Sequence, residues 1–357
     1  MFAHLMKTTH RNLGIDALRV FSIAMVILGH AGTFDGSTLL SIWRMPLFFI
    51  LSGFFLVPYG RSLRFEAARR WETLVIPYLA WSMIITLVVL VVKWSDPAEL
   101  LHHLHTGWRG GTGRSIFWMS SWFLLTLAIS AVMLRYFERF PRWVAWAVGI
   151  GGIVASRVFV YLDRADVLDG HPFAELPLRL GISLPVIFYL LIGQEIRTRI
   201  MPIVTELSAT RATSIGVVLI VAPLILVAHF NIPAQYIHAG LFGWPVITPA
   251  ISIIVTIGFL MVFATGVNRA LHRWVLAARL IGRLARTGST VVLGHGLILL
   301  YMYNVGFNGS SLTDLAIRFS VTLVLAFAIG VLVNMTPAAR LFSGVPRERP
   351  ARIATAA

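Results

Sequence analysis

The sequence predicts an all-α, polytopic integral membrane protein with about ten transmembrane helices and both termini in the cytoplasm. Of its 357 residues, 57% are hydrophobic and 13% are charged, which is not the composition of a soluble domain. Long apolar runs alternate with clusters of basic residues along the whole chain. Because a helical span needs about 20 apolar residues, about ten such runs fit within this length and leave the rest for loops.

The first apolar run, residues 13–31, follows Lys7 and Arg11 and therefore resembles a signal peptide. Asp16 and Arg19 within the run, and the lack of a convincing small-residue cleavage site, favour a first span that is retained. Nine further runs follow between the charge clusters. They are 39–58, 74–93, 116–134, 143–161, 180–194, 213–230, 246–266, 288–306 and 312–334. The run 180–194 is the shortest.

The basic residues set the orientation of these runs, because cytoplasmic loops carry an excess of Lys and Arg. With the N-terminus inside, most of the 30 Lys and Arg residues fall on cytoplasmic segments. These segments are the N-terminus, 61–70, 135–142, 197–211, 269–286 and the residues from 340 onward. Few basic residues fall on the outer loops. The alternation holds from loop to loop, so it supports the sidedness of the whole chain.

The net charge of +15 follows from this orientation and from attraction to membrane lipids, so nucleic acid is not an expected partner. No internal repeat or low-complexity stretch is visible. The sequence therefore predicts one transmembrane domain over residues 1–339. Residues 340–357 are expected to form a basic, disordered cytoplasmic tail.

Two polar residues in the first run need a partner or a function, because charge inside a span costs a few kcal/mol. Arg19 and His30 are 11 residues apart, so both lie on one helix face, about 16 Å apart. One interpretation is a long anionic cofactor whose reactive end lies near His30. The other is structural: Arg19 pairs with Asp16, and His30 is the polar end of the span. Asp35 follows in the next loop and could orient the His30 imidazole as a base.

A set of motifs occurs in order between Asn12 and about Leu300. They are Gly14-Ile-Asp-Ala-Leu-Arg19, the Arg19-x10-His30 spacing, Met45-Pro-Leu-Phe-Phe-Ile-Leu-Ser-Gly53-Phe54-Phe55, the run from Arg64 to Arg70 before Pro77-Tyr78, Ser121-Trp122-Phe123-Leu124, and Gly288-Ser289 with Leu293-Gly294-His295. This set resembles the acyltransferase family 3 proteins, which are bacterial membrane O-acyltransferases that modify sugars. The chain differs from the family at Thr73, where a further arginine is frequent, and at Thr290, where tyrosine is common.

The resemblance implies an enzyme of the bacterial cytoplasmic (inner) membrane that uses acyl-CoA, usually acetyl-CoA, from the cytosol. The acyl group would pass to a hydroxyl of a glycan or lipid-linked glycan at the outer side. His30 would be the catalytic base or a transient acyl carrier. Arg19, Arg69 and Arg70 would bind the acyl-CoA, because guanidinium groups suit phosphates.

Further candidates each have a functional and a structural interpretation. Arg44 would stabilise a developing oxyanion or anchor at the headgroups. Trp122 would stack on a sugar or serve as an interface anchor. His295 would line a cavity and contact the substrate, or bond a neighbouring helix. Gly53, with Ser52 before it, would allow close helix packing.

Some chemistry is excluded or disfavoured by the sequence. There is no cysteine, so thiolate metal sites and a Cys nucleophile are excluded. The cluster His102, His103 and His105 has no nearby carboxylate set to complete a site, so no metal is expected. The competing functions are a transporter or flippase of glycolipid or acyl groups, and a non-catalytic relative. Transporters tend to have internal repeats and broken helices, and neither is visible here.

Overall fold

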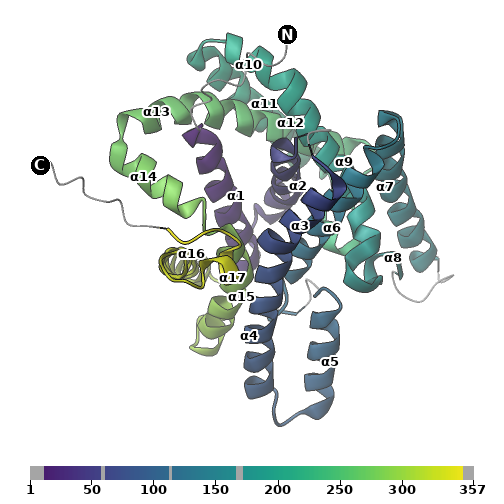
Figure 1. Ribbon diagram of the computed structural model, residues 1–357, viewed down its shortest axis with the longest axis vertical. Coiled ribbons are helices and arrows are strands. Elements are labelled where there is room, and N and C mark those ends of the chain that lie inside the picture. Colours follow the sequence, from purple (N-terminus) through teal and green to yellow (C-terminus); the bar gives the residue numbers. More distant parts are fainter. Residues whose placement is uncertain (1–11, 58–60, 112–114, 166–171, 349–357) are drawn as a thin grey trace, which may run out of the picture.

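The computed structural model describes residues 12–57, 61–111, 115–165 and 172–348, and within these ranges the chain is helical with no strand longer than an isolated bridge (Figure 1). The first half contains α1 Leu13–Ala31, α2 Ser37–Phe55, α3 Leu63–Arg70, η1 Trp71–Val75, α4 Ile76–Val92, α5 Pro97–Trp108, α6 Ser121–Phe137, α7 Arg142–Arg164, α8 Pro172–Glu175 and η2 Pro177–Arg179. The second half contains α9 Leu180–Glu195, η3 Ile196–Ile200, α10 Met201–Glu206, α11 Ala209–Phe230, η4 Ile237–Ala239, α12 Ile247–Met261, η5 Val262–Val267, α13 Asn268–Arg273, α14 Val275–Leu284, α15 Gly288–Asn304, α16 Leu312–Met335 and α17 Ala339–Ser343.

Each of the ten predicted apolar runs falls on a helix of the structure. Eight helical stretches among the described residues are long and apolar enough to cross a membrane. The other two runs fall on α6 and α15, which are 17 residues long. The prediction was wrong about the length of 180–194, because the helix continues through the π-helical turn η3 to Glu206. Arg197 and Arg199 ended the apolar run in the sequence but do not end the helix. The count of ten spans and the cytoplasmic termini stay predictions.

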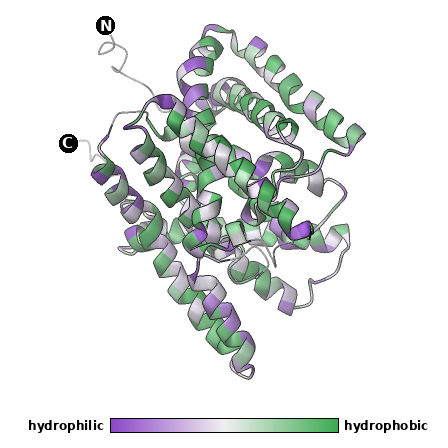
Figure 2. Ribbon diagram, turned by 90° about the vertical axis from the view of Figure 1, so that its right-hand side faces the viewer, coloured by the Kyte–Doolittle hydropathy of each residue, from purple (hydrophilic) through white to green (hydrophobic). Residues whose placement is uncertain are grey.

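Hydrophobic residues predominate along the helices, as Figure 2 shows, and many of their side chains are exposed. Val91, Val218 and Ile225 are 80%, 61% and 61% exposed. Exposed apolar side chains on helix after helix are unfavourable in water, but they match the hydrocarbon of a bilayer. The chain is therefore an integral membrane protein. α1 lies inside this bundle and contacts α2, α12, α13, α14, α15 and α16, so its polar side chains face other helices.

α2 and α9 cross at two glycines, Gly53 and Gly193. A Cβ atom at Gly53 would overlap backbone atoms of Leu190, and one at Gly193 would overlap backbone atoms of Ile50. The absence of both side chains lets the two backbones touch, which is how helices pack closely in lipid. This contact agrees with the close packing expected at Gly53, and it fixes α2, which carries one wall of the site described below.

Gly53→Val is expected to destabilise the protein by about 1–3 kcal/mol or more, because the added methyl groups must push α2 and α9 apart. The measurement is the folded yield and the melting temperature of the purified protein in detergent. Gly151→Val is the matched control, because a Cβ atom at Gly151 on α7 meets nothing within 4 Å. Equal stability of the two variants would contradict the close crossing of α2 and α9.

A buried network of charges holds the end of α2. Arg135 is 4% exposed and donates from Nη1 to Glu138 (2.5 Å) and from Nη2 to the carbonyl of Val57 (2.8 Å). Gln194 donates from Nε2 to Glu138 (2.9 Å) and to the carbonyl of Leu56 (3.1 Å). A buried charge is costly unless it is paired, and here the pairing joins α2, α6 and α9. The segment after Phe55 is therefore fixed.

The C-terminal boundary differs from the prediction of a disordered tail that begins at Arg340. Residues 339–343 form α17, and the ring of Phe342 lies 5.8 Å from that of Trp81. The carbonyl of Phe342 accepts hydrogen bonds from Trp81 Nε1 and Thr290 Oγ1, both at 3.2 Å. Residues 340–348 are ordered because these contacts bury Phe342 against the bundle. Residues 349–357 lie outside the described part of the chain.

Candidate active site

A large basic cavity lies along the middle of α1, on the N-terminal side of His30, where Arg19, Ser22 and Ile23 line it. Its volume is about 530 Å³, and α1, α2, α3, α6 and α15 contribute to its wall. Six arginines line it: Arg19, Arg61, Arg69, Arg70, Arg197 and Arg286. None of the described residues that line it is acidic. The cavity therefore provides a concentrated positive field in a partly enclosed space, which suits a multiply charged anion.

The basic cavity keeps most of its arginines in defined positions. Arg70 is held through Nε by the buried carboxylate of Glu66 (2.7 Å), which leaves its two terminal nitrogens. Arg197 donates to the carbonyl of Phe54 (3.1 Å), and Arg286 to that of Pro346 (2.7 Å). Arg19 lies 3.8 Å from Asp16 and is half-exposed. The structure thus contains the predicted pair of Arg19 with Asp16 and also places Arg19 in the cavity wall.

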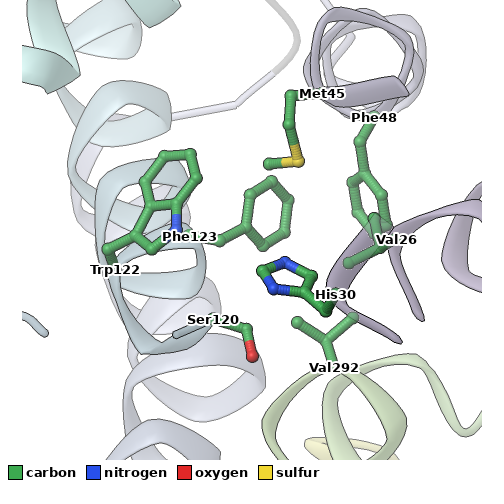
Figure 3. A pocket seen from close by; sticks show the side chains of 8 residues that line it. All are labelled: Val26, His30, Met45, Phe48, Ser120, Trp122, Phe123 and Val292. Atoms are coloured by element: carbon green, nitrogen blue, oxygen red, sulfur yellow. The ribbon is translucent and has the colours of Figure 1, made fainter. Parts of the chain in front are cut away.

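His30 lies in a small pocket, the His30 pocket, that adjoins the basic cavity (Figure 3). Its volume is about 20 Å³, enough for about one water molecule. Three residues line both spaces: Phe48, Phe123 and Val292. We call these three residues the neck. Because all three are apolar, the wall that the two spaces share is uncharged.

His295 of α15 faces His30, with ring centroids 5.3 Å apart. It is fully buried, and its Nδ1 lies 3.0 Å from the carbonyl oxygen of Val291, four residues earlier in the helix. That carbonyl can only accept, so the hydrogen is assigned to Nδ1. Nε2 is then an acceptor in the neutral ring. It is buried and finds no hydrogen-bond partner among the described residues.

Arg44 of α2 brings a positive charge to the His30 pocket. Its guanidinium lies against Gly29, where a Cβ atom would overlap it. Two of its nitrogens, Nε and Nη1, are buried and make no hydrogen bond within the described ranges. His30 lies within electrostatic range of Arg44, His238 and His295. Buried N–H groups without partners are costly, so this guanidinium is prepared to bind an oxygen atom of a ligand.

Arg318 of α16 fixes the end of α1 next to His30. It is 4% exposed, and its Nε donates to the carbonyl of Ala31 (2.6 Å). Its Nη1 donates to the carbonyls of Phe307 (2.9 Å) and Gly309 (2.8 Å). These bonds satisfy carbonyls near helix ends that would otherwise be unpaired. The charge of Arg318 inside a predicted span is thereby explained.

The wall of the His30 pocket opposite α1 is formed by Trp122 and Ser120. Trp122 is 4% exposed, so it is not a lipid-facing anchor at the surface. Its ring lies 5.8 Å from that of His238. Figure 3 shows Ser120 on the wall across from His30, with its hydroxyl turned away from the ring. The sequence analysis missed Ser120 and His238. Neither belongs to a motif, and His238 lies in a segment between α11 and α12 whose path the sequence does not indicate.

Among the predicted site residues, the structure brings together His30, Arg44, Trp122 and His295. It places Arg19, Arg69 and Arg70 in the adjoining basic cavity. The expectation that Asp35 orients His30 was wrong. Asp35 is exposed, lines a different cavity, and makes no hydrogen bond or ion pair with His30. The chain leaves α1 at Ala31, where Arg318 holds it, and carries Asp35 past the end of the helix.

The histidine cluster of α5 has local contacts only. The rings of His102 and His103 lie 5.8 Å apart, and His103 lies 5.1 Å from the ring of Phe117. No group of three or more His, Asp or Glu side chains that could hold a metal ion occurs among the residues the structure describes.

Comparison with known families gives one match. The model of an acyltransferase domain, that of acyltransferase family 3, matches residues 12–335. This is nearly the whole chain and includes α1, α2, α6 and α15, which form the His30 pocket. No curated protein and no solved structure matches the chain. The family resemblance of the motifs is confirmed, and the chain belongs to acyltransferase family 3, a family of acyltransferase domains.

Proposed function

We propose that this protein is a membrane-bound O-acyltransferase that moves an acyl group, most simply acetyl, from cytosolic acyl-CoA to a sugar hydroxyl. The acceptor would be a surface or exported glycan, or its lipid-linked precursor, and the membrane the cytoplasmic membrane of a bacterium. One observation carries the proposal: the basic cavity and the His30 pocket meet at the neck of Phe48, Phe123 and Val292.

The donor's chemistry matches this division of the site. Coenzyme A has phosphate groups at one end and a thioester at the end of a long, uncharged arm. Six arginines line the basic cavity and no described acidic residue does, which suits the phosphates. An apolar neck suits the uncharged arm and disfavours the phosphates. Because the His30 pocket has a volume of about 20 Å³, the neck side chains must move apart to admit the acyl group.

The chemical step then follows from the groups around His30. The acceptor hydroxyl gives its proton to His30 as its oxygen attacks the thioester carbonyl. The carbon–sulfur bond breaks, the acyl group stays on the acceptor oxygen, and the thiolate leaves with the proton from His30. Arg44 would stabilise the negative charge on the carbonyl oxygen, since two of its N–H groups are unpartnered. His295 Nε2 can accept a hydrogen bond from a second hydroxyl of the acceptor, next to the one that reacts.

The class of activity is tested by supplying radiolabelled acetyl-CoA to inside-out membrane vesicles that contain the native acceptor. We expect label in a glycan or glycolipid fraction only when the protein is present. No transfer from acetyl-CoA or longer acyl-CoAs, by a protein shown to bind the donor, would overturn the proposal and favour transport or a non-catalytic role.

The neck gives a sharper test. Val292→Phe is expected to lower acyl transfer at least tenfold and to change acetyl-CoA affinity less than twofold, because a larger ring obstructs the neck but leaves the arginines in place. Binding is measured on the purified protein and transfer in vesicles. Val292→Ala is the size control and should transfer normally. Normal transfer by Val292→Phe would show that the acyl group does not pass the neck.

A further inference from the structure

A third cavity, the distal cavity, lies near the C-terminal end of α1. Its volume is about 680 Å³. The loop between α1 and α2, the C-terminal halves of α7 and α11, and residues 231–244 contribute to its wall. Its charged and aromatic lining residues are Asp35, Arg157, Arg164, Tyr236 and Trp244. The donor site proposed above uses none of them.

Two arginines give this cavity its charge. Arg157 and Arg164 are seven residues apart on α7, so they lie on one helix face, about 10 Å apart along the axis. Arg157 makes one long hydrogen bond, from Nη1 to the carbonyl of Gly243 (3.4 Å). Neither guanidinium forms an ion pair with any residue that the structure describes. The cavity is lined by two guanidinium groups and one carboxylate, that of Asp35. Its net positive charge favours an anionic ligand.

Two aromatic rings line the same space. Tyr236 and Trp244 are 43% and 41% exposed, so part of each ring is accessible from the cavity. A ring face of this kind packs against the C–H groups of a sugar ring, while charged and polar neighbours bind its substituents. Aromatic faces beside arginines and a carboxylate are therefore suited to a charged saccharide.

The segment that carries Tyr236 and Trp244 is held in place by buried hydrogen bonds. Gln235 is 1% exposed and donates to the carbonyls of Ile42 and Thr248, both at 3.3 Å. It also accepts a hydrogen bond from Tyr189 (2.5 Å). The cavity wall is thus preorganised, as a binding site requires.

Two ring contacts link the wall of the distal cavity to that of the His30 pocket. Tyr236 contacts the ring of His238 at 6.3 Å, and His238 contacts Trp122 of the His30 pocket at 5.8 Å. Tyr236 also lies within electrostatic range of Arg44. The basic cavity approaches His30 from one end of α1, and the distal cavity approaches it from the other.

From these observations we infer that the distal cavity binds the acceptor, and that the acceptor is a sugar bearing an anionic group, a carboxylate or a phosphate. Arg157 and Arg164 hold the anionic group, Tyr236 and Trp244 hold the ring, and Asp35 accepts hydrogen bonds from its hydroxyls. This assignment rests on the proposed acyl transfer, for which it names the acceptor class.

The test is the binding of three probes to the purified full-length protein at low salt. The probes are a trigalacturonate, a singly phosphorylated maltotriose, and neutral maltotriose. We expect one anionic probe to bind at least tenfold more tightly than the neutral one, and its identity separates a carboxylate from a phosphate acceptor. The combined substitutions Arg157→Gln and Arg164→Gln should weaken that binding at least tenfold. Arg109→Gln, at an exposed arginine directly after α5 and outside the cavity, is the matched control.

Acetyl-CoA affinity, measured on every variant, reports folding and separates the two proposals. Normal acetyl-CoA binding with at least tenfold weaker anionic-probe binding in the double variant supports the acceptor site. If neither anionic probe binds better than maltotriose, or if the preferred one binds equally well to the double variant, the acceptor site is overturned, while label transfer from acetyl-CoA still supports the enzyme. If the wild-type protein does not bind acetyl-CoA, the proposed function itself is overturned.

Discussion

His30→Ala is expected to lower acyl transfer by about 100- to 10,000-fold, the usual contribution of a general base, and to leave acetyl-CoA affinity within about twofold of wild type. The reason is positional. His30 lies beyond the neck from the arginines, so its loss removes the proton acceptor without changing the phosphate-binding groups. Transfer is measured with radiolabelled acetyl-CoA in inside-out vesicles, and binding by titration of the purified protein.

The matched control for His30 is His272→Ala, an exposed histidine on α13 outside the His30 pocket. It should transfer at the wild-type rate. A His30→Ala variant with near-normal turnover would show that the chemistry takes place elsewhere. The experiment also bears on the covalent alternative: label bound stably to the wild type but not to His30→Ala, in vesicles without acceptor, would identify an acyl-His30 intermediate.

Arg44→Gln is expected to reduce kcat by about 100- to 1,000-fold, the typical cost of removing one donor to an oxyanion. The KM for acetyl-CoA should change little, because the guanidinium is not among the residues that line the basic cavity. Two of its nitrogens are buried without a partner, so their interactions are made only when a ligand oxygen arrives. The measurement is a full kinetic comparison of kcat and KM.

Gly29→Ala provides an independent test of the same role. An added Cβ atom would overlap the Arg44 guanidinium, which is the end of a flexible side chain and can move away without unfolding the helix. We therefore expect a lower kcat with unchanged stability. Wild-type kcat in both Arg44→Gln and Gly29→Ala would exclude Arg44 from the chemical step.

The sequence predicted the parts of the structure that depend on local pattern. The first run coincides with α1, and the 11-residue spacing predicts one helix face for Arg19 and His30, because helical geometry fixes the relation between spacing and face. Arg19 lines the basic cavity and His30 the small pocket next to it. The approach of His295 to His30 joins α1 to α15, and a family motif rather than periodicity drew attention to it.

The errors arose where long-range contacts override local pattern. Asp35 is only five residues from His30, yet Arg318, nearly three hundred residues later, holds the end of α1 and the chain then leads away. Residues 340–348 have the sequence of a charged tail, yet the ring of Phe342 packs against that of Trp81. His238 and Tyr236 enter the site through a segment whose path depends on Gln235 and Thr248. No periodicity in the sequence reports such contacts.

The neck has a consequence for the membrane as a whole. Two water-accessible cavities approach His30 from opposite ends of the bundle, and a continuous aqueous passage between them would let ions leak and would dissipate the electrochemical gradient. Phe48, Phe123 and Val292 interrupt that passage with apolar surface, and the His30 pocket has a volume of only about 20 Å³. Moving a hydrated ion through such a constriction is strongly unfavourable. The three side chains proposed to line the path of the acyl group therefore also keep the bilayer electrically insulating.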